Sequence, residues 1–124
     1  MNPKQLLTKF YAAFSGKAKP ASALDEYMTD EELKTHIAFF ESAFPNYELE
    51  IEDLLEEGNQ VAVRARIKAV HAGDLNGIPP TYKKVDLPFL GIYKIENDKI
   101  TQHWLGADQL ALLSQLGVVP EMAH

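Results

Sequence analysis

The feature that most constrains the fold is a change of hydrophobic period near residue 46. Before this point, apolar residues recur every three or four positions, which is the spacing of one face of an α-helix. After it, apolar and polar residues alternate, which places them on opposite faces of a β-strand. Helices followed by strands, rather than an alternation of the two, predict an α+β fold with an antiparallel sheet.

Three helical segments are expected before the change of period. The first covers residues 2–15, with Asn2 as its N-cap. A short second helix is expected over residues 21–28. The third begins at a cap on Thr29 and continues to about Phe44, because a threonine followed three residues later by glutamate is typical of a capping box.

Four strands are expected after the change of period, joined as a meander by turns at residues 58–59 and 97–98. The first two strands carry opposite charges on their polar faces, and cross-strand attraction favours their pairing. A sheet of so few long strands must curl around the helices to bury its apolar face, which leaves a tapered interior suited to a small molecule. The charged positions are Glu48, Glu50 and Glu52 on the first strand and Arg64, Arg66 and Lys68 on the second.

The pairing of the last two strands decides which way His103 and Trp104 face. A tight turn at residues 97–98 and a regular ladder would place Tyr93 opposite Gln102 and Gly91 opposite Trp104. Trp104 is then expected in the interior and His103 outside. A single bulge would reverse this, because one extra residue shifts the facing of every residue beyond it.

Composition limits the classes of function. The 124 residues are expected to form one domain, residues 1–124. The net charge of −6 provides no basic surface for nucleic acid. No stretch approaches the roughly 20 apolar residues of a membrane span. The absence of cysteine excludes disulfides and thiolate chemistry and fits a cytoplasmic protein.

Three residues are candidates for acid–base chemistry. His71 shares the inward face of its strand, and histidine is well suited to proton transfer near neutral pH, although a structural role at the strand end explains it equally well. His103 is the second candidate. Asp108 precedes the last helix, over residues 109–116, where it could cap that helix or act in the pocket as an acid or base. No metal-ligand spacing and no phosphate loop occurs, so no cofactor is expected.

Several segments resemble one family. Residues 66–81, with His71 followed by Gly-Ile-Pro-Pro-Thr, together with Gln102-His103-Trp104 and Asp108-Gln109-Leu110, are similar to the SnoaL-like polyketide cyclases. The resemblance implies the cone-shaped nuclear-transport-factor-two-like (cystatin-like) fold, a curved antiparallel sheet with N-terminal helices packed inside it. Tyr82 stands where the family usually has glycine, and Gln102 where it often has an acidic residue.

The resemblance also implies a reaction, a cofactor-free intramolecular aldol condensation. Asp108 would be the acid or base, and His71 would help to stabilise the enolate. An isomerase is a related possibility, and a non-catalytic binding module for a small hydrophobic ligand is the alternative. We expect a homodimer formed through the convex face of the sheet. Apolar and aromatic side chains would bind the substrate: Tyr11, Phe14, Phe40, Tyr82, Phe89 and Trp104.

Overall fold

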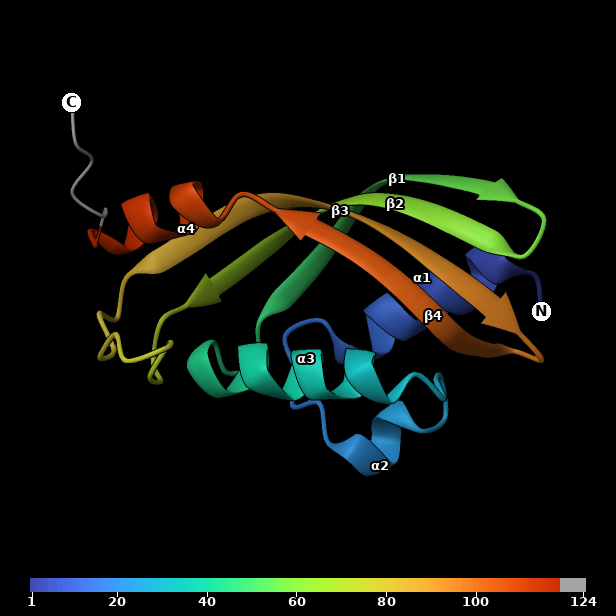
Figure 1. Cartoon of the computed structure of the whole chain (residues 1–124), viewed down its shortest axis with the longest axis horizontal. Coiled ribbons are helices and arrows are strands. Elements are labelled where there is room, and N and C mark those ends of the chain that lie inside the picture. The colour runs from blue at the N-terminus through green and yellow to red at the C-terminus, as the bar shows by residue number, and fades with distance from the viewer. Residues whose placement is uncertain (119–124) are drawn as a thin grey trace.

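A curved four-stranded sheet covers three N-terminal helices in the computed structural model, which describes residues 1–118 (Figure 1). The strands are antiparallel and adjacent in chain order, β1-β2-β3-β4. The predicted α+β class, with helices packed inside a curved antiparallel sheet, is therefore confirmed. The elements are α1 (Pro3–Phe14), α2 (Ala21–Leu24), α3 (Glu31–Ala43), β1 (Glu48–Glu57), β2 (Gln60–Val70), β3 (Lys84–Glu96), β4 (Lys99–Ala107) and α4 (Gln109–Leu116).

Helix α1 begins at the cap that the sequence predicts. The Asn2 side chain accepts the backbone N–H of Gln5 at 2.8 Å, and the Gln5 side chain accepts the backbone N–H of Asn2 at 3.0 Å. This reciprocal pair satisfies two amides that would otherwise be free at the helix start. The helix then turns one apolar stripe toward the sheet: Leu6, Leu7, Phe10, Tyr11 and Phe14.

Helix α3 is capped by Asp30 rather than by Thr29, so the predicted cap is wrong by one residue. Asp30 Oδ1 accepts the backbone N–H of Leu33 at 3.0 Å. The Thr29 N–H instead donates to the carbonyl of Ile100, and Met28 forms a bridge to the same residue of β4. These contacts with β4 draw the chain out of helical geometry, which is why α2 ends at Leu24 and not at residue 28.

The charged hairpin of β1 and β2 pairs as the sequence predicts, with Glu50 opposite Arg66. Lys68 Nζ lies 2.8 Å from a Glu50 carboxylate oxygen, and Arg64 lies 3.4 Å from Glu52. Exposed ion pairs of this kind contribute about 0–1 kcal/mol each. Their main effect is on the register of the two strands, since a slip by one residue would move every apolar side chain to the solvent.

Strand β4 contains the bulge that reverses the expected facing of its residues. The turn at Asn97 and Asp98 is tight, with φ of 51° and 59°, and Ile95 pairs with Ile100 as expected. The register then shifts, so that Tyr93 pairs with His103. Trp104 consequently lies on the outer face and is 50% exposed. The predicted inward orientation of Trp104 is wrong because one extra residue, Thr101, stands between the paired positions.

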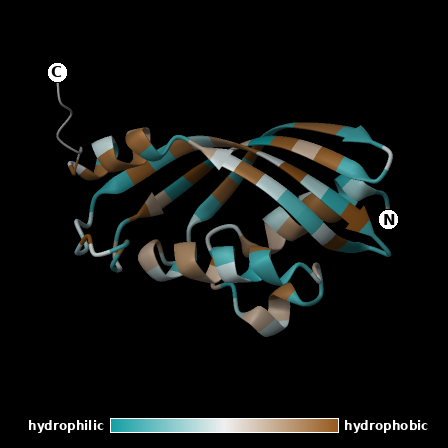
Figure 2. Ribbon diagram, viewed as in Figure 1, coloured by the Kyte–Doolittle hydropathy of each residue, from teal (hydrophilic) through white to brown (hydrophobic). Residues whose placement is uncertain are grey.

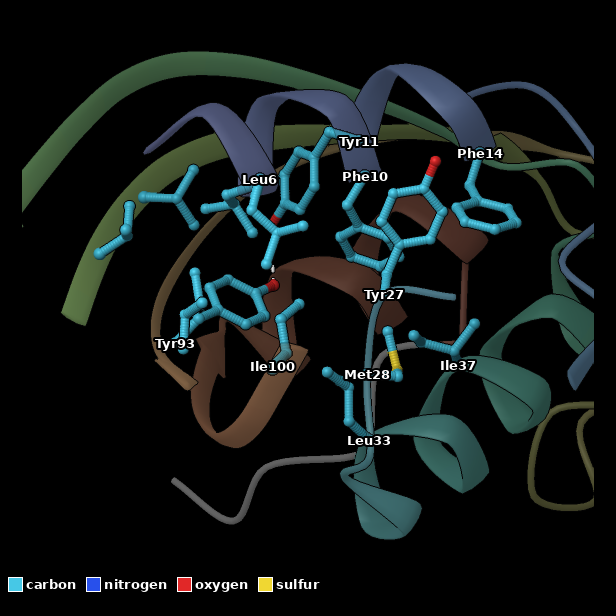
Figure 3. Close-up of a cluster of buried hydrophobic side chains, with 14 of the residues drawn as sticks. Leu6, Phe10, Tyr11, Phe14, Tyr27, Met28, Leu33, Ile37, Tyr93 and Ile100 are labelled. Atoms are coloured by element: carbon cyan, nitrogen blue, oxygen red, sulfur yellow. Dashed lines mark hydrogen bonds between the residues drawn. The ribbon is translucent and has the colours of Figure 1, made fainter. Parts of the chain in front are cut away.

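The interior holds two apolar clusters. Along the strands in Figure 2, hydrophobic and hydrophilic residues alternate, as a half-buried sheet requires. The larger cluster lies between α1, α3 and the sheet and is drawn in Figure 3. The smaller one lies under α4 and includes Phe44, Leu87 and Leu116. Within residues 1–118, no helix is both long and apolar enough to cross a membrane.

Candidate functional site

A cavity of about 140 Å³ opens between the helices and the concave face of the sheet. Residues of α1, α3 and all four strands line it, because the curvature of the sheet holds its centre away from the helices. Most of the lining is apolar. The side chains that line it include Phe10, Leu33, Ile37, Phe40, Leu49, Ile67, Phe89 and Leu105, together with the more polar Tyr11, His36, Tyr47, Tyr93 and Gln109.

Two buried tyrosines meet at the cavity wall (Figure 3). The hydroxyl oxygens of Tyr11 on α1 and Tyr93 on β3 are 2.7 Å apart. Burial raises the pKa of Tyr11 well above its usual value of 10 and raises that of Tyr93 to about 12. Burial also raises the pKa of Tyr47, with the nearby Tyr93 adding to the effect. All three phenols are therefore protonated at neutral pH.

An aspartate–histidine pair lies beside the cavity, although neither of its two residues is part of the lining. The Nδ1 atom of His103 is 2.6 Å from Oδ2 of Asp30, and the two side chains are only 12% and 9% exposed. Because Oδ1 of Asp30 is engaged by Leu33, the carboxylate is held at the start of α3. Donation of the Nδ1 proton to a carboxylate leaves Nε2 as the basic nitrogen of the neutral imidazole.

His36 adds a second imidazole, and it lines the cavity itself. His36 is exposed on one side of α3, but its ring is partly enclosed at the cavity. This partial desolvation lowers its pKa, and the neighbouring His103 lowers it further, whereas Glu32 acts in the opposite direction. His36 is therefore neutral at neutral pH. His36 and His103 are far apart in the sequence, and no local pattern connects them.

The bulge in β4 and the burial of each side chain decide which of the predicted ligand-contacting residues line the cavity. Tyr11, Phe40 and Phe89 do. Phe14 does not, because it packs edge-on against Phe10 and Tyr27 in the core, with ring centroids 5.5 and 5.6 Å away. Tyr82 is 71% exposed on the loop after β2 and also lies outside the lining. Trp104 lies on the outer face of the sheet.

His71 is fully buried but does not line the cavity. Its Nδ1 atom accepts the backbone N–H of Thr81 at 3.1 Å and lies 3.0 Å from the Thr81 hydroxyl oxygen. Its ring packs on Phe44, with centroids 5.3 Å apart. Nε2 has no hydrogen-bond partner within residues 1–118. These contacts close the loop between β2 and β3, which is the structural role that the sequence left open.

Asp108 is exposed and caps α4. Its Oδ1 atom accepts the backbone N–H of Ala111 at 2.9 Å. The flanking residues Ala107 and Gln109 line the cavity, whereas Asp108 itself does not. The structure thus does not bring Asp108 and His71 together in one cavity. The structure instead brings His103 to Asp30, with His36 nearby. The capping-box pattern of the sequence points to Thr29 and gives no sign of Asp30.

Metal ligands do not gather here: in the part of the chain that the structure describes, no group of three or more histidine and carboxylate side chains could hold a metal ion. The acid–base groups that line the cavity are three phenols and the His36 imidazole, and the pair of His103 and Asp30 lies beside them.

A family model described as SnoaL-like polyketide cyclase matches residues 5–116. No curated protein matches the sequence.

Solved structures of similar fold carry different functional names. AclR from Streptomyces galilaeus, provisionally named a hydroxylase, is 22% identical, with 98% of this chain and 84% of that one aligned at a TM-score of 0.80. IdmH from Streptomyces antibioticus, provisionally named a polyketide cyclase, is 21% identical over 95% and 100% of the two chains, with a TM-score of 0.79. A SnoaL-like polyketide cyclase from Agrobacterium tumefaciens is 17% identical over 94% and 99%, with a TM-score of 0.74. At these identities the likeness establishes the fold and not the reaction.

Proposed function

Since the chain belongs to the SnoaL-like polyketide cyclase family, we propose that it carries out cofactor-free acid–base chemistry on a small hydrophobic compound. The reaction is a cyclisation or isomerisation that begins when a proton is removed from a carbon next to a carbonyl group. A general base for this step must have a pKa near neutrality and must lie within reach of the substrate. The proposal therefore depends on which titratable group stands at the cavity.

The observation that carries the proposal is the contact between His103 and Asp30. A carboxylate bonded to Nδ1 fixes the imidazole tautomer and stabilises the imidazolium that forms when Nε2 takes a proton. His103 lies on the inner face of β4, two residues before Leu105 and opposite Tyr93, and both of these neighbours line the cavity. This arrangement supports His103 as the base and Asp30 as the residue that orients it.

Asp108 and His71 remain predicted catalytic residues with weaker support. The Asp108 carboxylate is occupied as a helix cap, and His71 is enclosed by the loop that it closes.

An epoxide hydrolase would need two carboxylates bridged by an arginine in the cavity. Arg64 and Arg66 instead pair with acidic residues on the outer face of the sheet, and neither lines the cavity. The arginine contacts therefore argue against an epoxide hydrolase, and His103 stays the base of the proposed reaction.

The test is exchange of solvent deuterium into a panel of aromatic and alicyclic ketones in D2O, followed by NMR. The wild-type protein should accelerate exchange of protons next to the carbonyl. His103→Gln should lower the rate by about 100-fold or more, which is the usual contribution of a general base. Asp30→Asn should also lower the exchange rate. This variant should leave helix α3 intact, because asparagine is as good an N-cap as aspartate.

Asp108→Asn is the control that separates the two assignments. It should retain exchange, since asparagine also caps α4. Loss of exchange in Asp108→Asn with full activity in His103→Gln would assign the chemistry to Asp108 and refute His103. Ketones that bind but undergo no exchange with the wild-type protein would favour the non-catalytic binding module.

We further propose that two copies associate through the outer face of the sheet. Figure 1 shows α1–α3 on the opposite face. Four large apolar side chains are exposed on the outer face, and charged residues such as Asp53 and Arg64 lie beside them. A face with both signs of charge can pair with its own copy about a twofold axis. The apolar residues are Leu55, Leu90, Ile92 and Trp104.

The cytoplasmic location stays a prediction.

A further inference from the structure

The tyrosines at the cavity have more hydroxyl protons to donate than there are protein atoms that accept them. Tyr11 and Tyr93 have one hydroxyl proton each, and the hydrogen bond between their oxygens uses only one of the two. Within residues 1–118, no other atom accepts the second proton. Both side chains line the cavity and are only 2% and 3% exposed. The pair therefore has one O–H donor left over, in a place that is nearly closed to bulk solvent.

Tyr47 supplies another unused donor. It lines the same cavity from the start of β1, is 6% exposed, and its hydroxyl has no hydrogen-bond partner within residues 1–118. Among these residues, the only fully enclosed side-chain nitrogen or oxygen without a hydrogen-bond partner is Nε2 of His71. The Tyr47 oxygen must therefore have open space beside it. Tyr47 shares the lining of this small cavity with the hydrogen-bonded pair of Tyr11 and Tyr93. In agreement with this, Tyr47 adds to the raised pKa of Tyr11, and Tyr93 adds to that of Tyr47.

The position of Tyr47 is fixed by a buried lysine. Lys19 Nζ lies over the Tyr47 ring at 3.9 Å from its centroid and donates to the Tyr47 backbone carbonyl at 3.1 Å. The same ammonium is paired with Glu41 at 3.0 Å. The ring also packs edge-to-face with Phe40, with centroids 4.9 Å apart. Held by both contacts, it has little freedom to turn its hydroxyl elsewhere. The unused donor is thus part of a rigid wall.

We infer that Tyr11, Tyr47 and Tyr93 form a binding site for the carbonyl oxygen of the ligand, and that the ligand is a ketone or ester built on a single ring. Two O–H donors match the two lone pairs of one carbonyl oxygen. A ligand without an acceptor would leave both donors buried and unpaired, which is costly in an apolar cavity. A cavity of about 150 Å³ holds one benzene ring, and the cavity here has about 140 Å³.

The raised pKa values of these tyrosines fit the inference, because a phenol that stays protonated remains a donor. The inference deepens the proposed function and rests on it for the reaction. Tyr93 and His103 are opposite each other on β3 and β4, so a carbonyl held by the tyrosines would have its neighbouring carbon beside the imidazole. The negative charge that develops on the oxygen when that carbon loses a proton would meet donors already in place.

The test compares two ligands of the same shape, acetophenone and α-methylstyrene, in which a CH2 group replaces the carbonyl oxygen. Affinities are measured by NMR titration for the wild-type protein and for the triple variant Tyr11→Phe/Tyr47→Phe/Tyr93→Phe. The preference for acetophenone, expressed as the ratio of the two Kd values, should be at least about fivefold smaller in the triple variant. Tyr27→Phe is the matched control: this core tyrosine does not line the cavity, and its loss should leave the ratio unchanged.

A second readout follows the carbonyl directly. With acetophenone labelled with 13C at the carbonyl, the bound signal should lie downfield in the wild-type protein relative to its position in hydrocarbon solvent, because hydrogen bonding polarises the carbonyl. An unchanged ratio in the triple variant, a bound signal at the hydrocarbon position, or failure of the wild-type protein to bind acetophenone would each overturn the inference. If the triple variant does not fold, the wild-type carbonyl signal and the single variant Tyr47→Phe decide.

These measurements need no turnover, so they separate the two proposals. Carbonyl preference without deuterium exchange would support the tyrosine site and contradict the proposed reaction. Exchange that His103→Gln abolishes, with no carbonyl preference, would support the reaction and contradict the tyrosine site.

Discussion

Gly73 offers the sharpest test of how the loop after β2 is fixed. A Cβ atom at this position would lie 1.9 Å from the backbone oxygen of Ser42 and 3.2 Å from the Cα atom of Ala43, at the end of α3. The first distance is more than 1 Å below any ordinary contact, and its partner is backbone that cannot swing aside. The N–H groups of Ala72 and Gly73 both donate to the carbonyl of Ala43, at 3.1 and 3.0 Å. Gly73→Ala must therefore separate the loop from α3.

The expected cost follows from these contacts. Two backbone hydrogen bonds contribute about 1 kcal/mol each, and forcing a methyl group into a closed contact costs about 1–3 kcal/mol. The free energy of unfolding should therefore fall by about 3–5 kcal/mol, measured by urea denaturation followed by circular dichroism. Gly106→Ala is the control, because a Cβ there would meet nothing within 4 Å. If Gly73→Ala costs no more than Gly106→Ala, the close approach of the loop to α3 is refuted.

Two further predictions concern His36 and Trp104. Because partial burial lowers the pKa of His36 in the folded state, the unfolded state binds more protons than the folded state just below about pH 6.5. The free energy of unfolding should therefore fall as the pH drops from this value toward the folded-state pKa, and should level off below it. Urea unfolding of His36→Gln should give a shallower decrease, and an equal slope in both proteins would contradict the lowered pKa. Trp104→Lys should shift the protein toward monomer in light scattering at micromolar concentration, whereas Phe39→Lys, at an exposed residue of α3, should not. A monomeric wild-type protein would remove the proposed interface.

Local chemistry explains what the sequence predicted well. The cap at Asn2, the charged hairpin and the tight turn at Asn97 and Asp98 each depend on residues that are close in the chain or directly paired. The same holds for Asp108, whose capping interaction joins residues three positions apart. Such features follow from periodicity and turn preferences, which every segment carries by itself.

The candidate site is different, because its members are far apart in sequence. Asp30 and His103 are 73 positions apart, and Tyr11 and Tyr93 are 82 apart. Each pair exists only because α1 and α3 pack inside the curved sheet, and no local pattern in the sequence indicates which residues will meet there.

The sequence by itself determined the order of helices and strands and the apolar faces that they bury, since both depend on local spacing. The tertiary structure decided which side of β4 faces the cavity. One unpaired residue, Thr101, turned His103 inward and Trp104 outward, and a bulge leaves no mark in a pattern of alternation until its partner strand is known. The same packing brought His103 to Asp30, because the residue that caps α3 lies beside β4 only in the folded chain.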